Sequence, residues 1–238
     1  MADLVVIGGG VVGLALADAW LARNPADDVV VYDKEKSLAA HASGRNSGVL
    51  HAGFYYAPDS LKARLTRDGN AMLKEFCAER GIEVRNTGKV VVTTSEEQLS
   101  SLMTLLERGQ ANGVELELID EAGLAELEPL ARTVDKALWS PNTAVASSAG
   151  VVEGLAARVR ERGGRVELDS AVTGGGPGWV MSLRDGHVNA GHVINAAGLY
   201  ADTVAHWFGF GADYRMLPFK GLYWYGNWEP GRLQRHVY

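Results

Sequence analysis

The feature that most constrains this chain is a glycine-rich turn between an apolar strand and a helix. An apolar run at residues 3–7 leads into Gly8, Gly10 and Gly13, and a helical pattern follows over residues 14–23. In a βαβ unit the first glycine permits a tight turn, the second lets the backbone approach a pyrophosphate, and the third lets the helix pack closely on the strand. The helix N-terminus adds free N–H groups and a partial positive charge, which favour a bound phosphate. The pattern therefore predicts a dinucleotide-binding crevice.

The second strand of this unit ends in an acidic residue where a ribose would need one. The apolar run at residues 29–32 leads to Asp33, which follows Gly13 by twenty residues. A carboxylate at this place accepts hydrogen bonds from ribose hydroxyls, and its negative charge disfavours a 2′-phosphate. The alternative is an ordinary glycine-rich turn in an α/β protein. The position of Asp33 favours the nucleotide site over that alternative.

Charge and cysteine content narrow the class of protein further. The formal net charge of −6 argues against a surface that binds nucleic acid. The single cysteine, Cys77, allows no internal disulfide, so we expect a cytoplasmic protein.

Asp3 and Asp18 interrupt the N-terminal apolar stretch, which argues against a signal peptide, and no later segment is apolar enough to span a bilayer. Peripheral contact with the inner face of a membrane stays open, and the scattered histidines predict no metal site.

A second strand–glycine–helix junction lies late in the chain. A run of apolar and small residues at 192–197 leads to Gly198, and residues 199–208 have a helical pattern. We expect this segment to return to the nucleotide, so that the nucleotide domain is discontinuous. The predicted fold is α/β, with a Rossmann-like domain and an inserted α+β cap domain for the substrate. The expected parts are 1–84 and 146–212 for the nucleotide domain, and 85–145 and 213–238 for the cap, the last part being incomplete.

Between the two junctions the apolar periodicity and the positions of Gly and Pro predict further helices. They are expected over residues 59–80, 96–112, 120–128 and 149–162.

The loop at residues 42–56, with the sequence ASGRNSGVLHAGFYY, is the most specific stretch of the chain. Together with the GGGVVG opening and the VINAAGLYAD stretch at residues 193–202, it resembles the D-amino-acid-oxidase-like FAD oxidoreductases. Within them the chain is most similar to the L-2-hydroxyglutarate dehydrogenases and oxidases. The resemblance extends across nearly the whole chain, including residues 57–64 and 217–221.

The resemblance implies FAD as the cofactor and assigns residues to it. Gly8, Gly10 and Gly13 match the pyrophosphate turn of the family, and Asp33 stands where the family usually has a ribose-binding glutamate. The other matches are the returning Gly198, the backbone of Val172 near the adenine, and a loop beside the diphosphate and the isoalloxazine that comprises Ser43, Arg45, Asn46, Ser47 and Gly48.

Three departures from the family pattern bear on activity. The family commonly reads V-D-S-H near the end of the cap insertion, where this chain has V-A-S-S at residues 145–148. It often reads R-G-E-Y where this chain has K-G-L-Y at residues 220–223. Relatives run to roughly four hundred residues, the size of two-domain enzymes. We therefore expect a C-terminally truncated chain that ends within the cap sheet.

Oxidation of a 2-hydroxy acid by a flavin requires a held carboxylate, a C–H bond directed at flavin N5 and a base for the hydroxyl proton. His51 follows the flavin loop, and we expect it to be that base or to bind the substrate; the alternative is a hydrogen bond to the loop backbone. Arg45 is a candidate for carboxylate binding, with a phosphate or backbone contact as the alternative. Lys220 is a candidate polar group at the cap face, and a solvated surface position is its alternative.

The resemblance thus predicts an FAD-dependent oxidoreductase that acts on a CH–OH donor. The expected reaction is the oxidation of a small 2-hydroxy acid, L-2-hydroxyglutarate to 2-oxoglutarate, by hydride transfer to flavin N5. The expected electron acceptor is oxygen or a membrane quinone. Two alternatives stay open: another enzyme of the superfamily, acting on an amino acid, an amine or glycerol 3-phosphate, and an inactive truncated fragment that binds FAD.

Overall fold

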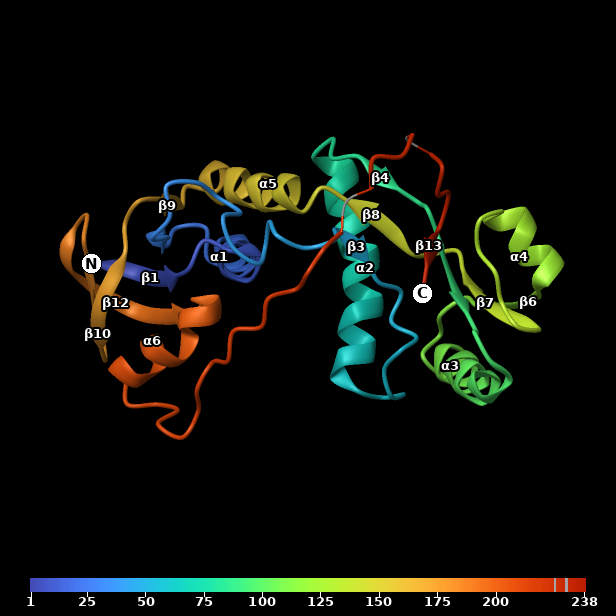
Figure 1. Ribbon diagram of the computed structural model, residues 1–238. Coiled ribbons are helices and arrows are strands. Elements are labelled where there is room, and N and C mark those ends of the chain that lie inside the picture. The colour runs from blue at the N-terminus through green and yellow to red at the C-terminus, as the bar shows by residue number, and fades with distance from the viewer. Residues whose placement is uncertain (225, 230) are drawn as a thin grey trace. The chain divides into compact units, whose positions relative to one another are not determined.

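The computed structural model describes residues 1–224, 226–229 and 231–238. The chain divides into two compact units (Figure 1). Unit 1 comprises Met1–Asn46 and Ser148–Leu222, and unit 2 comprises Ser47–Ser147 and Tyr223–Tyr238. Each unit has its own sheets and helices.

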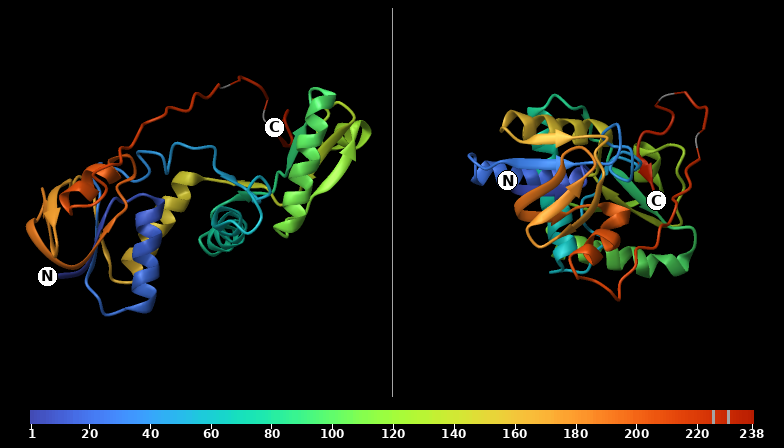
Figure 2. Two further views of the ribbon diagram at one scale, coloured as in Figure 1. Left: turned by 90° about the horizontal axis from the view of Figure 1, so that it is seen from below. Right: turned by 90° about the vertical axis from the view of Figure 1, so that its left-hand side faces the viewer.

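Unit 1 is built on a mixed six-stranded sheet. Its order is β10 (Val172–Gly176), β11 (Trp179–Ser182), β12 (Gly186–Asn195), β1 (Ala2–Ile7), β2 (Val29–Tyr32) and β9 (Arg165–Glu167). Strands β12, β1, β2 and β9 run parallel, and β10, β11 and β12 form an antiparallel meander. Figure 2 shows these strands from two further directions. The parallel core confirms the predicted α/β class with a Rossmann-like domain.

Helices cover both faces of this sheet because its central strand is apolar on both sides. They are α1 (Val11–Arg23), α5 (Ser148–Glu161) and α6 (Ala201–Trp207), the last preceded by a 3-10 turn at Gly198–Tyr200. Val5 and Ile7 of β1 share a buried cluster with Val204 of α6. On the opposite face Val6 lies against Gly13 of α1, and α1 packs against α5. In Figure 1 α5 lies above β1 and α6 below it, the arrangement that buries a parallel sheet.

Unit 2 contains a four-stranded and a three-stranded sheet. The first has the order β13 (His236–Val237), β5 (Lys89–Val92), β7 (Lys136–Ser140) and β6 (Glu117–Asp120), and the second has the order β3 (Val49–Leu50), β8 (Ala144–Ala146) and β4 (Val84–Arg85). Its helices are α2 (Leu61–Glu79), α3 (Leu99–Ala111) and α4 (Glu121–Leu127), with a 3-10 turn at Glu96–Gln98. All three helices lie within ranges predicted from the sequence.

Side-chain caps determine where two of these helices begin. The Ser60 hydroxyl accepts a hydrogen bond from the Ala63 N–H at 3.1 Å before α2. The Asp120 carboxylate accepts one from the Gly123 N–H at 2.9 Å before α4. Each cap satisfies one of the N–H groups that a first helical turn leaves without a partner.

The compact units are bounded differently from the expected domains. The sequence predicts residues 47–84 in the nucleotide domain, but they belong to unit 2, because β3 and β4 both pair with β8. Of the predicted incomplete cap segment at 213–238, residues 213–222 belong to unit 1, whereas the rest joins unit 2 through the pairing of β13 with β5. Positions 225 and 230 of that segment lie outside the described residues.

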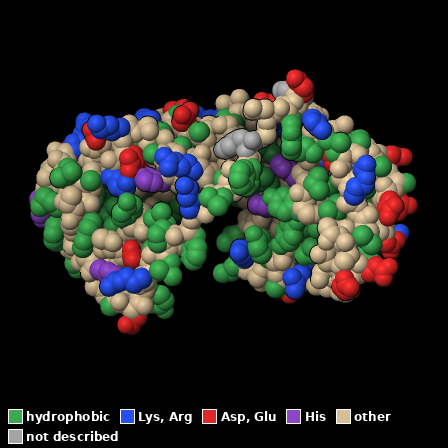
Figure 3. Space-filling view, viewed as in Figure 1, with side chains coloured by type: hydrophobic (Ala, Val, Ile, Leu, Met, Phe, Trp, Pro, Cys, Tyr) green, Lys and Arg blue, Asp and Glu red, His purple; other side chains and the backbone are tan. Residues whose placement is uncertain are grey.

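The surface of unit 2 carries a group of acidic side chains over α4 and the adjoining end of β6 (Figure 3). Glu117, Asp120, Glu121 and Glu126 are all exposed there. A negative surface of this kind repels nucleic-acid phosphates.

Within the described ranges, no helix combines the length and the apolarity that crossing a bilayer requires.

Candidate functional site

The turn between β1 and α1 accepts only glycine at two positions. Gly8 has a φ of +112°, and a Cβ there would lie 2.3 Å from the Ala196 carbonyl oxygen. A Cβ on Gly13 would lie 2.0 Å from the Gly8 carbonyl oxygen. The Ala196 N–H donates to the Ile7 carbonyl at 2.9 Å, so the strand that returns late in the chain lies directly beside this turn. Close approach of backbone to backbone therefore requires both glycines.

The N-terminus of α1 presents positive charge beside this turn. Gly10 is the N-cap residue and supplies no side-chain cap, and the first turn contains no acidic residue. Ser43 takes the capping role from the neighbouring loop, because its hydroxyl accepts a hydrogen bond from the Val11 N–H at 3.0 Å. The next N–H groups of a first helical turn have no intrahelical partner. The structure thus places Gly10 and Ser43 together at an end of a helix suited to an anion.

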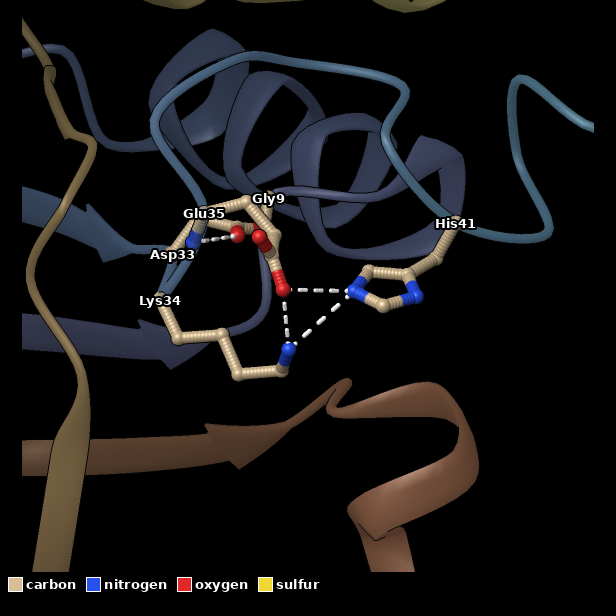
Figure 4. Close-up of polar contacts among 5 residues, drawn as sticks. All are labelled: Gly9, Asp33, Lys34, Glu35 and His41. Atoms are coloured by element: carbon tan, nitrogen blue, oxygen red, sulfur yellow. Dashed lines mark hydrogen bonds and ion pairs between the residues drawn. The ribbon is translucent and has the colours of Figure 1, made fainter.

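Asp33 is oriented toward the glycine turn. Its Oδ2 accepts a hydrogen bond from the Gly9 N–H at 2.8 Å, and its Oδ1 accepts one from the Glu35 N–H at 2.9 Å (Figure 4). Each oxygen of an ionised carboxylate has two acceptor positions, so both keep one for a further donor. The carboxylate is therefore fixed in place and still able to bind a hydroxyl group.

Three charged or titratable side chains next to Asp33 were not identified from the sequence. Glu35 accepts hydrogen bonds from Lys34 and, at 2.7 Å, from His41 (Figure 4). The bond from Lys34, and next the bond from His41, hold the pKa of Glu35 at about 2. Lys34 Nζ also lies 4.9 Å from the ring centre of Tyr200. The charge run at residues 33–36 signals a polar loop, but it does not show which of these groups meet.

Two later segments of unit 1 lie beside its first βαβ unit. The Ser170 N–H donates to the Asp33 carbonyl at 2.9 Å, which brings the start of β10, and with it Val172, near the end of β2. Gly198 follows β12 with a φ of +57°, and a Cβ there would meet no atom within 4 Å. The carboxyl ends of β1, β2 and β12 meet at one edge of the sheet, where α/β folds bind ligands.

The predicted flavin loop is divided between the two units. Arg45 and Asn46 end the first part of unit 1, and the Asn46 side chain donates to the Ala42 and Ser43 carbonyls, at 3.0 Å each. Ser47 and Gly48 begin unit 2. A Cβ on Gly48 would lie 2.3 Å from the Ala146 carbonyl oxygen, so the pairing with β8 by itself explains this glycine.

A second polar cluster lies in unit 2 and contains one of the predicted catalytic residues. His51 is half-buried, and its Nδ1 lies 3.4 Å from Nζ of Lys89, a side chain with no exposed surface. Lys89 Nζ also lies over the ring of Tyr238, at 3.9 Å, and of Tyr55, at 4.9 Å. Among the described residues no carboxylate forms an ion pair with Lys89. His236 completes the cluster, and within the described part of the chain its buried Nε2 has no hydrogen-bond partner.

Burial sets the charge states in this cluster. Burial lowers the pKa of Lys89 to about 8. Burial first, and then the charges of Lys89 and His236, lower the pKa of His51. Burial and the nearby Lys89 and Arg85 likewise lower the pKa of His236.

The predicted catalytic residues do not all belong to one unit. His51 lies in unit 2, whereas Arg45 and Lys220 belong to unit 1 and are exposed. Lys89 and His236 were not identified from the sequence. The only available signal is that Lys89 opens the apolar run of β5, where a buried lysine is unusual. The described residues contain no group of three or more His, Cys, Asp or Glu side chains suited to a metal ion.

A comparison with protein families matches residues 3–236 to the FAD dependent oxidoreductase family, DAO. The chain belongs to this family. The match confirms the superfamily and the fold that the sequence predicted, and FAD is the cofactor of the family.

Curated relatives give a finer comparison. The chain is 38% identical over 230 residues to "L-2-hydroxyglutarate dehydrogenase, mitochondrial" of Caenorhabditis elegans. The matched region covers 93% of this chain and 53% of the relative. It is 35% identical over 237 residues to the Homo sapiens protein of the same name, covering 93% and 51%. It is 34% identical to the L-2-hydroxyglutarate dehydrogenase of an Escherichia coli strain, covering 100% and 57%. The chain therefore spans about half the length of the curated relatives it matches.

Solved structures confirm the fold of this family member. The L-proline dehydrogenase from P. horikoshii matches with a TM-score of 0.79 at 23% identity, over 88% of this chain and 56% of that one. The L-alpha-glycerophosphate oxidase from Mycoplasma pneumoniae, with FAD bound, matches with a TM-score of 0.78 at 23% identity, over 87% and 57%. At these identities the likeness concerns the fold alone.

Proposed function

We propose that this protein is an FAD-dependent oxidoreductase that converts L-2-hydroxyglutarate to 2-oxoglutarate. The observation that carries the proposal is the glycine turn, where a Cβ on Gly8 or Gly13 would meet backbone atoms and where Asp33 lies beside the N-terminus of α1. The substrate is supported by the identities of 34% and 38% to relatives named L-2-hydroxyglutarate dehydrogenase.

The residues of unit 1 fit the adenosine diphosphate part of FAD. In the proposed complex the Gly10 backbone and the free N–H groups of α1 bind the diphosphate, and Asp33 binds a ribose hydroxyl with its remaining acceptor positions. Ser43 holds the first turn of α1 from the adjacent loop. Val172 and Gly198 complete the set. Val172 follows Ser170, whose N–H donates to the Asp33 carbonyl at the end of β2, and Gly198 follows β12, which pairs with β1.

The remaining proposed roles concern the substrate. Bound FAD supplies the hydride acceptor, flavin N5. We assign to His51 a hydrogen bond to the oxygen of the substrate hydroxyl, and to Arg45 and Lys220 the binding of carboxylate groups, since both are exposed cations on segments that match the family. The same proposal names oxygen or a membrane quinone as the electron acceptor and a peripheral membrane contact as the place of quinone reduction.

Flavin absorbance tests this function directly. The purified chain, supplied with FAD, is expected to retain a visible flavin spectrum after gel filtration and to lose it under anaerobic conditions when L-2-hydroxyglutarate is added. D-2-Hydroxyglutarate, glycine, L-proline and glycerol 3-phosphate serve as comparison substrates. Bleaching by one of these in place of L-2-hydroxyglutarate would overturn the substrate, and a protein that stays colourless with FAD would overturn the cofactor-binding function.

The candidate residues and the acceptor are tested in the same assay. His51→Leu, which removes the hydrogen bond to the substrate oxygen, is expected to lower the rate of flavin reduction about tenfold, whereas His187→Leu, at an exposed hairpin position, is expected to leave it unchanged. Arg45→Met and Lys220→Met are expected to raise the KM. Reoxidation of the reduced protein by oxygen or by a soluble quinone then identifies the acceptor.

A further inference from the structure

The buried cluster of unit 2 constrains which ring nitrogen of His51 can carry the proton. Lys89 Nζ contacts Nδ1 of His51 and the rings of Tyr238 and Tyr55, and no carboxylate among the described residues compensates its charge. An ammonium group has three donors and no acceptor, so it can approach an imidazole nitrogen only where that nitrogen has a free lone pair. While Lys89 is charged, Nδ1 of His51 must therefore be unprotonated.

We propose that Lys89 is a positioning residue that holds His51 in its neutral Nε2–H tautomer, so that at neutral pH His51 donates a hydrogen bond to an oxygen of the substrate and does not remove its proton. The substrate part of this inference rests on the proposed function. The tautomer of His51 depends only on residues of this chain and can be tested without substrate or cofactor.

The electrostatics of the cluster agree with this geometry. Burial lowers the pKa of Lys89 to about 8, which leaves about nine tenths of the side chain charged at pH 7. Burial and the two neighbouring cations keep the pKa of His51 below its usual value, so its ring is neutral. The groups that face the pair are Tyr55 on the same loop, His236 and Tyr238 on and after β13, and Arg85 on β4 as a neighbour of His236.

Loss of the Lys89 proton reverses the arrangement. A neutral amine can accept a hydrogen bond from Nδ1–H, which leaves the lone pair on Nε2. The O–H bond of the substrate hydroxyl can then break with its proton bound to Nε2, while the hydride leaves the adjacent carbon for the cofactor that the proposed function supplies. We therefore expect the rate of flavin reduction to rise with pH, about tenfold per pH unit below pH 8, and to level off above it.

The tautomer can be measured on the whole chain without substrate or cofactor. Long-range 1H–15N correlation spectra of histidine rings give different patterns for the two neutral tautomers, and His51→Gln identifies the signals of His51 among the six histidines. Wild type is expected to show the Nε2–H tautomer at pH 7 and a transition near pH 8. Lys89→Arg, which cannot lose its proton, is expected to keep this tautomer at pH 9. Lys89→Met is expected to mix the tautomers at pH 7 and to raise the pKa of His51.

The outcomes separate this inference from the proposed function. An unchanged His51 pattern in Lys89→Met, or an Nδ1–H tautomer in wild type at pH 7, would overturn the inference even in an active protein. The predicted tautomers in a protein that does not oxidise L-2-hydroxyglutarate would support the inference and overturn the function. His236→Gln is the matched control: it removes a neighbouring ring without touching Nδ1 and is expected to leave the tautomer unchanged. The four histidines outside the cluster report whether each variant is folded.

Discussion

The glycine turn of unit 1 and the Lys89 cluster of unit 2 treat a charged side chain in opposite ways. At the turn, the carboxylate of Asp33 meets two backbone N–H groups at 2.8 and 2.9 Å, so fixed dipoles stabilise its charge. In the cluster, the ammonium of Lys89 is fully buried and meets aromatic rings and a histidine, with no carboxylate partner among the described residues. A charge held by the backbone serves as a rigid binding group. A buried charge without a counter-ion is costly, and its proton is available for chemistry.

Unit 2 is able to satisfy a buried charge elsewhere, which makes Lys89 an exception within its own unit. The Glu128 carboxylate is also fully buried, but it accepts hydrogen bonds from the N–H groups of Gln234 at 2.6 Å, Arg235 at 2.9 Å and Leu130 at 3.3 Å. These bonds join the segment before β13 to the end of α4. The charge of Glu128 therefore has a structural role that explains it, and that of Lys89 has none.

The largest effect is expected at the glycine turn. Gly13→Ala places a Cβ 2.0 Å from the Gly8 carbonyl oxygen, and backbone cannot yield as a flexible side chain does. We expect a loss of about 3 kcal/mol or more in the free energy of unfolding, at the upper end of overpacking effects, together with loss of FAD binding. Urea denaturation and flavin retention on gel filtration measure the two effects. Gly198→Ala is the control, because its Cβ meets open space and only the positive φ is strained, at about 1 kcal/mol. Equal losses in both variants would contradict the steric explanation.

The two buried charges of unit 2 should respond differently to removal. Glu128→Gln loses charge-assisted hydrogen bonds from backbone N–H groups, and we expect it to destabilise the protein by about 2–3 kcal/mol. Lys89→Met keeps the length of the side chain and removes an uncompensated charge, so we expect stability that is unchanged or raised by about 1 kcal/mol. Urea denaturation at pH 7 compares them. A Lys89→Met protein as unstable as Glu128→Gln would show that the ammonium stabilises the fold and would remove the contrast.

The pH dependence of stability tests the same contrast in the wild-type protein. The pKa of Lys89 is about 8 in the folded chain against an ordinary 10.5, so between these values the unfolded chain binds the proton more tightly. Stability must then rise with pH, by about 2 kcal/mol between pH 7 and pH 9.5. Below pH 7 both states are protonated and the term is constant. Lys89→Met is expected to lack the rise, and a wild-type curve that falls over this range would contradict the buried, uncompensated ammonium.

The sequence predicts the glycine turn better than the Lys89 cluster, because the parts of the turn are close together along the chain and those of the cluster are far apart. The glycine turn, α1 and Asp33 lie in one short segment whose spacing carries the geometry, and Gly198 repeats the same junction. The Lys89 cluster depends on β13, a strand of two residues that pairs with β5 from far along the chain. So short a strand has no alternation to detect. The two-residue strand β3 likewise hides the unit boundary after Asn46, and the contacts of Glu35 with Lys34 and His41 depend on a loop conformation that composition does not encode.

The smallest effect is expected where the backbone already satisfies the charge. Asp33→Asn keeps the shape of the side chain and one carbonyl acceptor, but it exchanges a charged acceptor for a neutral one and turns an NH2 group toward a backbone N–H. We expect about 1–2 kcal/mol weaker binding of FAD, measured as a tenfold or somewhat larger rise in Kd by flavin fluorescence titration. Asp213→Asn removes an equal charge from an exposed position of unit 1 and is expected to leave the Kd unchanged. An Asp33→Asn protein that binds FAD as tightly as wild type would show that this carboxylate only orders the turn and does not contact the ribose.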